Sequence, residues 1–224
     1  MKLFIILVVG YSAGSITLEL LKRAFNSESM KGWIISDDPQ RSVDSASLRS
    51  SVRLNSLVSV GFMTLCSFMF YGFLIREHTF SLGRMAFDIV LVILLYDFGY
   101  YFIHRYPFHE WKLLRRVHSI HHKTRHPRGI DSLLLHPVET CIGLGAFLAT
   151  VALVGGVHYY TFAVLFVGYT VLNVINHAGI GFQRFPLRTL GHLAVQHDKH
   201  HHNMRSGNYA FLTPIPDTLF GTIE

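Results

Sequence analysis

Charged residues are scarce in this chain. Asp, Glu, Lys and Arg make up 15% of its 224 residues, whereas they make up about 25% of an ordinary soluble domain. Hydrophobic residues make up 50% of the chain, and its mean hydropathy is +0.33. Such a composition excludes intrinsic disorder, because the chain has ample apolar surface to bury. It also argues against an ordinary cytosolic domain.

Cysteine is almost absent as well. The only two cysteines, Cys66 and Cys141, lie in apolar stretches of the sequence. Their number and positions support neither a disulfide framework nor a cysteine-ligated zinc site. The sequence also contains no internal repeat, no low-complexity tract and no glycine-rich phosphate loop.

Long apolar runs, in contrast, are frequent. A bilayer core ~30 Å thick requires about 20 mostly apolar residues per helix. Five runs approach this length, at 3–21, 54–75, 86–103, 138–157 and 159–176. The last two meet at Gly155-Gly156, which predicts a helical hairpin that enters and leaves the membrane on the same side.

The first run has an alternative interpretation. Lys2, an apolar stretch and then small residues are also typical of a cleaved signal peptide. The apolar pattern continues through Leu18, Leu20 and Leu21, past any such cleavage point. This continuation favours a retained membrane helix.

Basic residues are distributed unevenly among the connecting segments. Six of the 20 lie in 22–53, seven in 105–136 and four from residue 182 onward, which leaves Lys2, Arg76 and Arg84. With five spans the three basic regions share one face, so the partition is 17 to 3. The positive-inside rule places that face in the cytoplasm and the N-terminus outside, in a bacterial cytoplasmic membrane or the endoplasmic reticulum. Topology thus explains the net charge of +6, and nucleic acid is not expected as a partner.

Histidine is the residue in excess. Ten of the fifteen histidines lie in two windows, 104–122 and 192–202, both on the face assigned to the cytoplasm. His118, His121 and His122 are spaced i, i+3 and i+4, which would place three imidazoles on one helix face. A second H-x-x-H-H element begins at His197. Two such elements on one face predict metal binding.

Further histidines extend this set. His104 ends the third apolar run, and Pro107 is expected to break the helix so that His109 turns back. His177 ends the fifth run, one turn after Asn173. The predicted ligands are then His104, His109, His118, His121, His122, His177, His197, His200 and His201. Nine imidazoles exceed what one metal ion can use, so we predict two ions, which could be Fe, Zn, Cu or Ni.

Asp97 lies inside the third apolar run, where a carboxylate is costly and is by default functional or paired. Asp97, Tyr101 and His104 are spaced i, i+4 and i+7 and share one helix face. We expect Asp97 to accept the second N–H of a metal-bound imidazole, and we take Tyr101 and Asn173 as further candidate catalytic residues. Glu139 has two interpretations, since a carboxylate at a helix start also suits the helix dipole.

The other histidines that the sequence allows us to interpret have ordinary explanations. His78 and His158 fit packed core positions, and His126 and His202 fit surface positions.

The motifs together resemble the fatty acid hydroxylase and sterol desaturase superfamily, whose signature is H-x-x-x-x-H, then H-x-x-H-H, then a late H-x-x-H-H. The resemblance covers about residues 88–223 and includes the strings DFGYYFIHR, HSIHHK, HPVE, NHAGI, HDKHHHNMRSGNYAF and DTLFGT. It implies a membrane-embedded di-iron oxygenase with histidine ligands. Such an enzyme uses O2 and two electrons to hydroxylate or desaturate a C–H bond of a lipid. The nine histidines occupy matching positions.

Two departures from the family pattern affect what the resemblance implies. Asn173 stands where some members have a histidine, so one metal position is weaker, or is filled by water or by His136. The first box has four intervening residues where many sterol-acting members have three. The substrate could therefore be a sterol, oxidised or desaturated at C-4 or C-5, or a fatty acyl lipid.

We therefore expect an all-α integral membrane bundle of about four to five transmembrane helices with a histidine-rich metal site at its cytoplasmic face. Residues 1–85 would form N-terminal membrane helices and a cytoplasmic loop, and 86–224 the di-iron catalytic domain. The lipid would enter from the bilayer, and electrons would come from a separate cytochrome b5-like or ferredoxin-like protein. The alternative is a zinc or copper transporter or sensor. A transporter would need ionisable residues through the midplane of several spans, and the second, fourth and fifth runs have essentially none.

Overall fold

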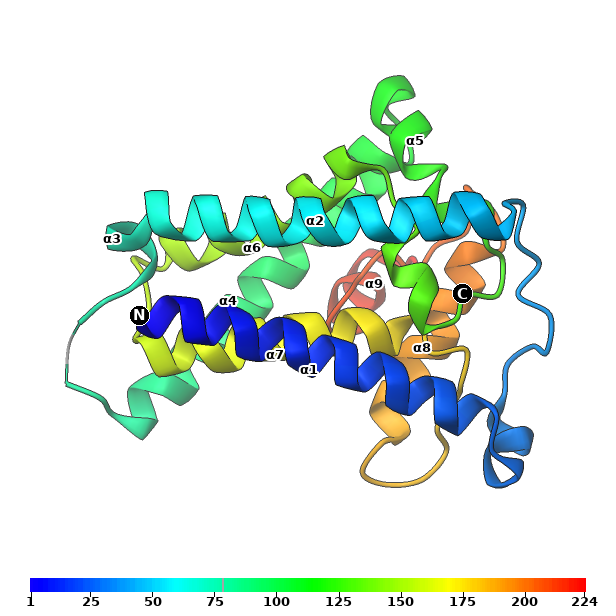
Figure 1. Ribbon diagram of the computed structural model, residues 1–224, viewed down its shortest axis with the longest axis horizontal. Helices are drawn as coiled ribbons and strands as arrows, with labels where there is room; N and C mark the ends of the chain where they lie inside the picture. Colours follow the sequence, from blue (N-terminus) through cyan, green and yellow to red (C-terminus); the bar gives the residue numbers. More distant parts are fainter. Residues whose placement is uncertain (78) are drawn as a thin grey trace.

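The computed structural model describes residues 1–77 and 79–224, so the prediction for His78 lies outside the described residues. Within these ranges the chain forms helices and isolated β-bridges but no strand. The long helices are α1 (Lys2–Phe25), α2 (Ser45–Met69), α4 (Leu82–Ile103), α6 (Pro137–Leu153) and α7 (Tyr159–Asn176). Helices α1, α2 and α7 run along the longest axis of the molecule, and α4 crosses them obliquely (Figure 1). The predicted all-α bundle is confirmed.

Four of these helices are long and apolar enough to cross a membrane. They are α1, α2, α7 and the segment Leu82–Phe108, which consists of α4 and the helical turn after it. Helix α6 is apolar but has only 17 residues. The expected range of four to five spans therefore holds, with α6 as the shorter fifth helix.

The helix ends differ from the predicted runs for local reasons. Helix α2 begins at Ser45 rather than at 54, because the Asp44 carboxylate accepts a 2.7 Å hydrogen bond from the Ser47 backbone N–H and caps the helix. Helix α6 ends at Leu153 rather than at 157. Gly155 and Gly156 follow with φ of +81°, a backbone conformation that favours glycine. They form the tight turn of the predicted α6–α7 hairpin.

The bundle interior is largely aromatic. Phe147, Phe162 and Phe166 are buried and pack against Tyr96 and Leu144. Helix α1 lies closely against α7, since a Cβ atom at Gly10 would meet the Phe166 ring at 2.3 Å. Only glycine fits this contact, so α1 belongs to the packed bundle.

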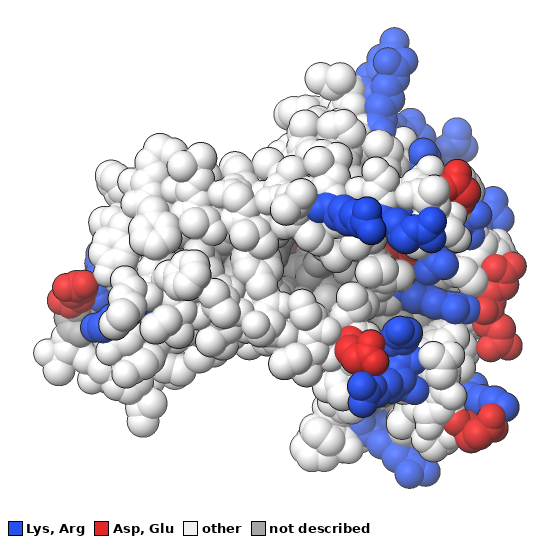
Figure 2. Space-filling model, viewed as in Figure 1, with Lys and Arg blue, Asp and Glu red and all other residues white. Residues whose placement is uncertain are grey.

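The outer surface divides into an apolar part and a charged end. Large apolar side chains such as Leu57, Leu65, Phe73 and Leu153 are exposed on the long helices. An exposed apolar belt of this kind is expected where lipid replaces water. Figure 2 shows Lys, Arg, Asp and Glu gathered at the end of the molecule opposite the N-terminus, with one small group at the other end.

Short elements build the charged end. A π-helical turn, His104–Phe108, continues α4 and contains Pro107. Three 3-10 turns, Glu28–Trp33, His121–Lys123 and Gly129–Leu133, lie between the long helices along the chain. The remaining helices are α5 (Lys112–His118), α8 (Arg188–His201) and α9 (Ile215–Phe220) at this end, and α3 (Tyr71–Leu74) at the other.

Candidate metal centre

The nine histidines predicted as ligands come together in two adjacent groups at the charged end. We call the group with five imidazoles site A and the group with four site B. Site A consists of His104, His109, His118, His122 and His200, and site B of His121, His177, His197 and His201. Within each group the possible ligand atoms all lie within 4.8 Å of one another.

Each H-x-x-H-H element contributes to both sites. Helix α5 ends at His118, and the chain continues as a 3-10 turn that contains His121 and His122. The prediction of one helix face for these three residues is therefore wrong. The change from α-helix to 3-10 turn instead sends His121 to site B and leaves the other two in site A. On the continuous helix α8, His197 and His201 lie one turn apart in site B, and His200 lies in site A.

The first box depends on its proline, as predicted. Pro107 lies inside the π-helical turn that begins at His104. It has no backbone N–H and does not fit a regular helix, so the turn widens there. His109 thereby returns to within 5.0 Å of His104, measured between ring centroids.

One loop, residues 204–209, orients three imidazoles of site A. The Nδ1 atoms of His104, His109 and His200 lie 2.8, 3.0 and 2.7 Å from the carbonyl oxygens of Tyr209, Met204 and Gly207. A carbonyl oxygen only accepts, so each of these imidazoles donates from Nδ1–H. In the neutral tautomer the Nε2 atom then carries the free lone pair.

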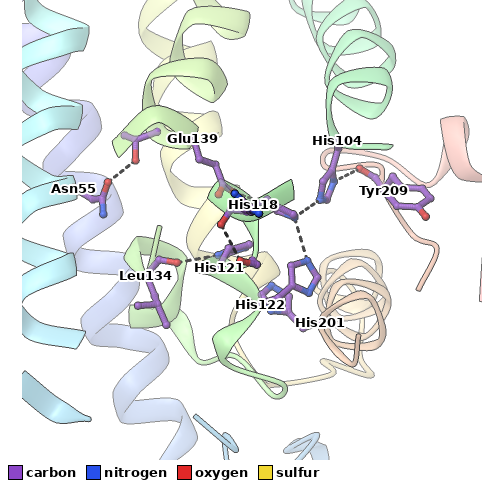
Figure 3. A network of polar contacts seen from close by, with 12 residues as sticks. Asn55, His104, His118, His121, His122, Leu134, Glu139, His201 and Tyr209 are labelled. Atoms are coloured by element: carbon purple, nitrogen blue, oxygen red, sulfur yellow. Dashed lines mark hydrogen bonds and ion pairs between the residues drawn. The ribbon is translucent and has the colours of Figure 1, made fainter. Parts of the chain in front are cut away.

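His118 is oriented by a carboxylate. Its Nδ1 lies 2.7 Å from Oε1 of Glu139, and both residues are buried. Figure 3 shows Glu139 reaching from α6 toward His118. A carboxylate on the far side of a metal-binding imidazole fixes its tautomer and raises its basicity. Glu139 thus takes the role that the sequence analysis gave to Asp97.

The Nε2 atoms of site A fit a bound cation. Those of His104 and His118 face each other at 3.1 Å, although the Nδ1 contacts place both protons on the opposite ring atoms. The buried Nε2 atoms of His109 and His200 have no hydrogen-bond partner. Lone pairs that converge in a buried space repel one another unless a cation lies between them. The donor set of site A therefore fits a metal ion.

Three of the four imidazoles of site B are also oriented through Nδ1, by carbonyl oxygens from separate segments of the chain. The Nδ1 atoms of His121, His177 and His201 lie 3.3, 2.7 and 2.9 Å from the carbonyl oxygens of Leu134, Asn173 and Thr124. Nε2 atoms of neighbouring site B imidazoles approach one another to 2.9–3.2 Å. These four imidazoles also fit one metal ion.

Burial keeps the imidazoles outside the membrane spans neutral. It lowers the pKa of His109 and His177 to about 4 and that of His200 to about 3. Because these values lie far below 7, the rings are unprotonated at neutral pH. Neutral imidazole is the form that binds a metal ion.

Asp97 contacts backbone rather than an imidazole, so its predicted role is corrected. Its two carboxylate oxygens accept hydrogen bonds from the backbone N–H groups of Phe211, Leu212 and Thr213 at 2.7–3.0 Å, and one accepts from the Thr213 hydroxyl at 2.6 Å. The backbone of residues 211–213 therefore occupies the carboxylate that was expected to accept from a metal-bound imidazole.

A second carboxylate anchors the same region. Asp217 on α9 accepts hydrogen bonds from the backbone N–H groups of Tyr209 and Ala210 at 2.9 and 2.7 Å and from the Thr222 hydroxyl at 2.7 Å. Both carboxylates are buried. They fix the chain on either side of Tyr209, the residue whose carbonyl orients His104.

Two other predicted site residues, Tyr101 and His136, make their polar contacts outside the two groups. The Tyr101 hydroxyl accepts from Arg105 at 2.7 Å and lies 3.1 Å from Thr222 Oγ1, and its ring stacks on Phe220. His136 caps α6, since its Nδ1 accepts from the Val138 backbone N–H at 3.2 Å. Among the described residues it belongs to neither group of possible metal ligands, so the expectation that it replaces a ligand is not met.

Asn173 contributes mainly through its backbone. Its carbonyl orients His177, and its side chain lines a cavity of about 80 Å³ beside both sites. The walls of this cavity include His104, His118, His121 and His177. A small reactant can therefore reach imidazoles of both groups from one space.

Asn55 is a residue that the sequence analysis missed. It is fully buried, donates from Nδ2 to the Leu135 carbonyl at 2.7 Å, and accepts from the Thr140 hydroxyl at 2.7 Å (Figure 3). It thus holds the segment whose Leu134 carbonyl orients His121. The sequence offered one indication of its role, because Asn55 is a polar residue near the start of the apolar run 54–75.

Comparison with known proteins agrees with this geometry. Residues 89–222 match the sequence model of a protein family described as "Fatty acid hydroxylase". A very-long-chain aldehyde decarbonylase GL1-8 of Oryza sativa subsp. indica is 32% identical over 167 residues, which cover 71% of this chain and 62% of the relative. Methylsterol monooxygenase 1 of Rattus norvegicus is 33% identical over 133 residues, which cover 56% and 43%.

A third relative is methylsterol monooxygenase 2-1 of Arabidopsis thaliana, 28% identical over 183 residues, or 71% of this chain and 65% of the relative. The chain thus spans 43 to 65% of the length of these three curated relatives. No solved structure matches it significantly.

Proposed function

Because this chain belongs to the fatty acid hydroxylase family, we propose that it is a membrane-embedded oxygenase that holds two iron ions and oxidises a C–H bond of a lipid. The observation that carries the proposal is the convergence of nine imidazoles in two adjacent groups, seven of them held through Nδ1 by an acceptor so that Nε2 offers a lone pair. His118 of site A and His121 of site B have ring centroids 5.5 Å apart, so two ions would act on one substrate.

The bound iron would supply the activation of O2. The residues of the chain supply orientation and a dry environment. Backbone carbonyls and Glu139 hold the imidazoles in the metal-binding tautomer. Tyr96, Tyr100 and Phe211 line the cavity next to the sites and give it an aromatic wall that would limit access of water. A shaped, dry cavity matters because nitrogen ligands alone do not protect a reactive centre from side reactions.

The orientation in the membrane follows from charge. Basic residues gather at the end that holds both sites (Figure 2). Under the positive-inside rule this end faces the cytoplasm of a bacterial cytoplasmic membrane, or the cytosol at the endoplasmic reticulum. Labelling of single cysteines placed at 116 and 220 should report the same face, opposite to one placed at residue 2. Labels on opposite faces for 116 and 220 would contradict the shared site.

The lipid and the electron donor belong to the same proposal. The relatives act on very-long-chain aldehydes and methylsterols by their names, which supports an acyl lipid or a sterol as substrate. The electrons would come from a separate cytochrome b5-like or ferredoxin-like protein that docks on the basic end. A zinc or copper transporter is the alternative, but no observation favours it, because all the ligands among the described residues lie at one end of the bundle.

Metal analysis and lipid analysis test the proposal together. Protein purified gently in detergent should contain about two iron ions per chain. Mass spectrometry of total lipids should detect an oxidised lipid only in cells that contain the protein. His200→Ala should abolish that product. The matched control is His192→Ala, an exposed histidine on the same helix, which should leave iron and product unchanged. One ion or fewer in active protein, or full activity of His200→Ala, would refute the proposal.

A further inference from the structure

Helices α1 and α2 leave a seam between them. Helix α1 packs mainly against α7 and α2 against α6, while α1 and α2 barely touch each other. A cavity of about 230 Å³ occupies the seam, and Gly14, Ser15, Ser56 and Val60 are among its walls. Figure 2 shows the surface hollowed between these two helices.

The seam cavity adjoins the cavity at the metal sites. The two share as walls Ser59, Ser132, Leu133, Leu144, Tyr169 and Asn173. The inner cavity also has His104, His118, His121 and His177 in its wall. The two cavities are therefore adjacent, and together they define a candidate route from the side of the bundle to both groups of imidazoles.

The outer mouth of this route faces hydrocarbon. It lies midway along α1 and α2, two helices that can cross a membrane. Large apolar side chains are exposed beside it, with Ile16, Leu57 and Val60 exposing 60, 74 and 45% of their surface. The exposed polar neighbours on α1 are the small residues Ser12 and Ser15. A molecule that entered here would come from the bilayer rather than from water.

A single tyrosine spans the seam at its inner boundary. The Tyr11 hydroxyl on α1 donates to the Ser59 carbonyl on α2 at 2.8 Å and lies 3.0 Å from Ser59 Oγ. Ser59 lines both cavities, so this contact lies where they meet. The Tyr11 ring is fixed on its other side by an edge contact with Phe166, at 5.3 Å between centroids.

We propose that the α1–α2 seam is a binding site for the hydrocarbon chain of an acyl lipid, which enters sideways from the bilayer, and that Tyr11 and Ser59 close its inner end. This inference rests on the proposed function. The inner cavity has a volume of only about 80 Å³, against about 230 Å³ in the seam, which suits the end of a slim chain better than a fused ring system. The α1 and α2 walls of the seam lie in residues 1–88, outside the matched family range, so the family match does not provide them.

Photochemical labelling tests the site directly. The iron-loaded full chain would be incubated with palmitic acid that carries a diazirine near its methyl end, and in parallel with a diazirine-bearing cholesterol. We expect the fatty acid probe to label residues 11–18 and 56–60, and excess palmitic acid to compete with it. Labelling confined to the outer surface, labelling that excess palmitic acid does not reduce, or seam labelling by the cholesterol probe alone would overturn the proposal.

Two substitutions on α2 provide a matched pair. Ser56→Trp should fill the seam and reduce seam labelling at least tenfold with iron content unchanged. Gly61→Trp adds the same side chain on the same helix at an exposed position with no atom within 4 Å of its Cβ, and should leave labelling unchanged. Tyr11→Phe keeps the ring but removes the hydrogen bond. It should speed labelling of the inner wall by about two- to tenfold, the factor that one hydrogen bond is worth.

If Ser56→Trp misfolds, the seam can instead be blocked chemically after the protein has folded. Ser56→Cys in a Cys66→Ala, Cys141→Ala background would be treated with a bulky maleimide after purification, and Gly61→Cys would serve as its control. Loss of seam labelling only in the modified Ser56→Cys protein supports the site, and unchanged labelling refutes it. Because iron content is measured separately, seam labelling without iron would reject the oxygenase alone, while iron without seam labelling would reject the entrance alone.

Discussion

Sites A and B use the same ligand but are supported differently. Three of the five imidazoles in site A depend on carbonyls of one loop, 204–209, and a fourth depends on the Glu139 carboxylate. In site B each oriented imidazole uses a carbonyl from a different segment, at Leu134, Asn173 and Thr124. Site A therefore relies on one loop and one charge, whereas the support of site B is spread over the fold. Substitutions in these supporting groups should thus affect metal binding at one site more than at the other.

Removing a ligand should give the largest effect and should identify each site. His200→Ala should lose the ion of site A first, and His121→Ala that of site B. In both variants lipid oxidation should fall by more than the ~10–100-fold that loss of a ligand's partner costs. Iron content and the spectroscopic signature of the remaining ion would distinguish the variants. Wild-type turnover and iron in both would show that the clusters are not ligands.

Glu139→Gln should come next and should affect site A more than site B. The amide keeps the size of the side chain but removes the charge that raises the basicity of His118. We expect a ~10–100-fold loss of affinity for the site A ion, measured by competition with a chelator. His136→Gln, three residues earlier and outside both groups, is the matched control. Equal loss from both sites would contradict the separate support described above.

Asp217→Asn should have a smaller effect, again on site A. The substitution replaces one acceptor oxygen by an amide donor facing the backbone N–H of Tyr209 or Ala210. The loop should loosen, and the site A ion should exchange about tenfold faster. Asp97→Asn should act in the same way because it anchors the adjacent segment. Metal exchange measured on folded protein would show this, and an equal change in site B would argue against a loop effect.

Asn173→Ala should give the smallest effect. The contact to His177 comes from the backbone carbonyl, which the substitution retains. Iron content should stay at the wild-type level, and turnover should change by no more than about twofold. A loss of site B iron comparable to that of His121→Ala would show that the Asn173 side chain acts as a ligand or holds one.

The sequence predicted which histidines come together better than it predicted the groups that orient them. Spacing alone identified all nine histidines, because two H-x-x-H-H elements and Pro107 are local patterns. It assigned Asp97 to the wrong partner, since the partner lies more than 110 positions away along the chain and is backbone. Glu139 stayed ambiguous because its partner, His118, lies on a separate helix 21 positions earlier in the chain. Most of the groups that orient the imidazoles are backbone carbonyls, and the residue type gives no indication of where a carbonyl points.

Fold prediction shows the same limit. The apolar runs indicated α1, α4 and α7 correctly, but the start of α2 depended on the cap at Asp44. The seam between α1 and α2 had no signal in the sequence. It results from the way α1 packs on α7 through Gly10, a contact between segments about 150 residues apart.

The division of each H-x-x-H-H element between the two sites has a thermodynamic consequence. Residues 118–122 and helix α8 each belong to both sites, so an ion in either site fixes the two segments that the other ion needs. Binding of the first ion would order the two segments and would carry the entropic cost of doing so. The second ion would then bind more tightly. By linkage this gain is mutual. Uptake of the two ions should therefore show positive cooperativity, so that weakening one site should also weaken the other by a smaller factor.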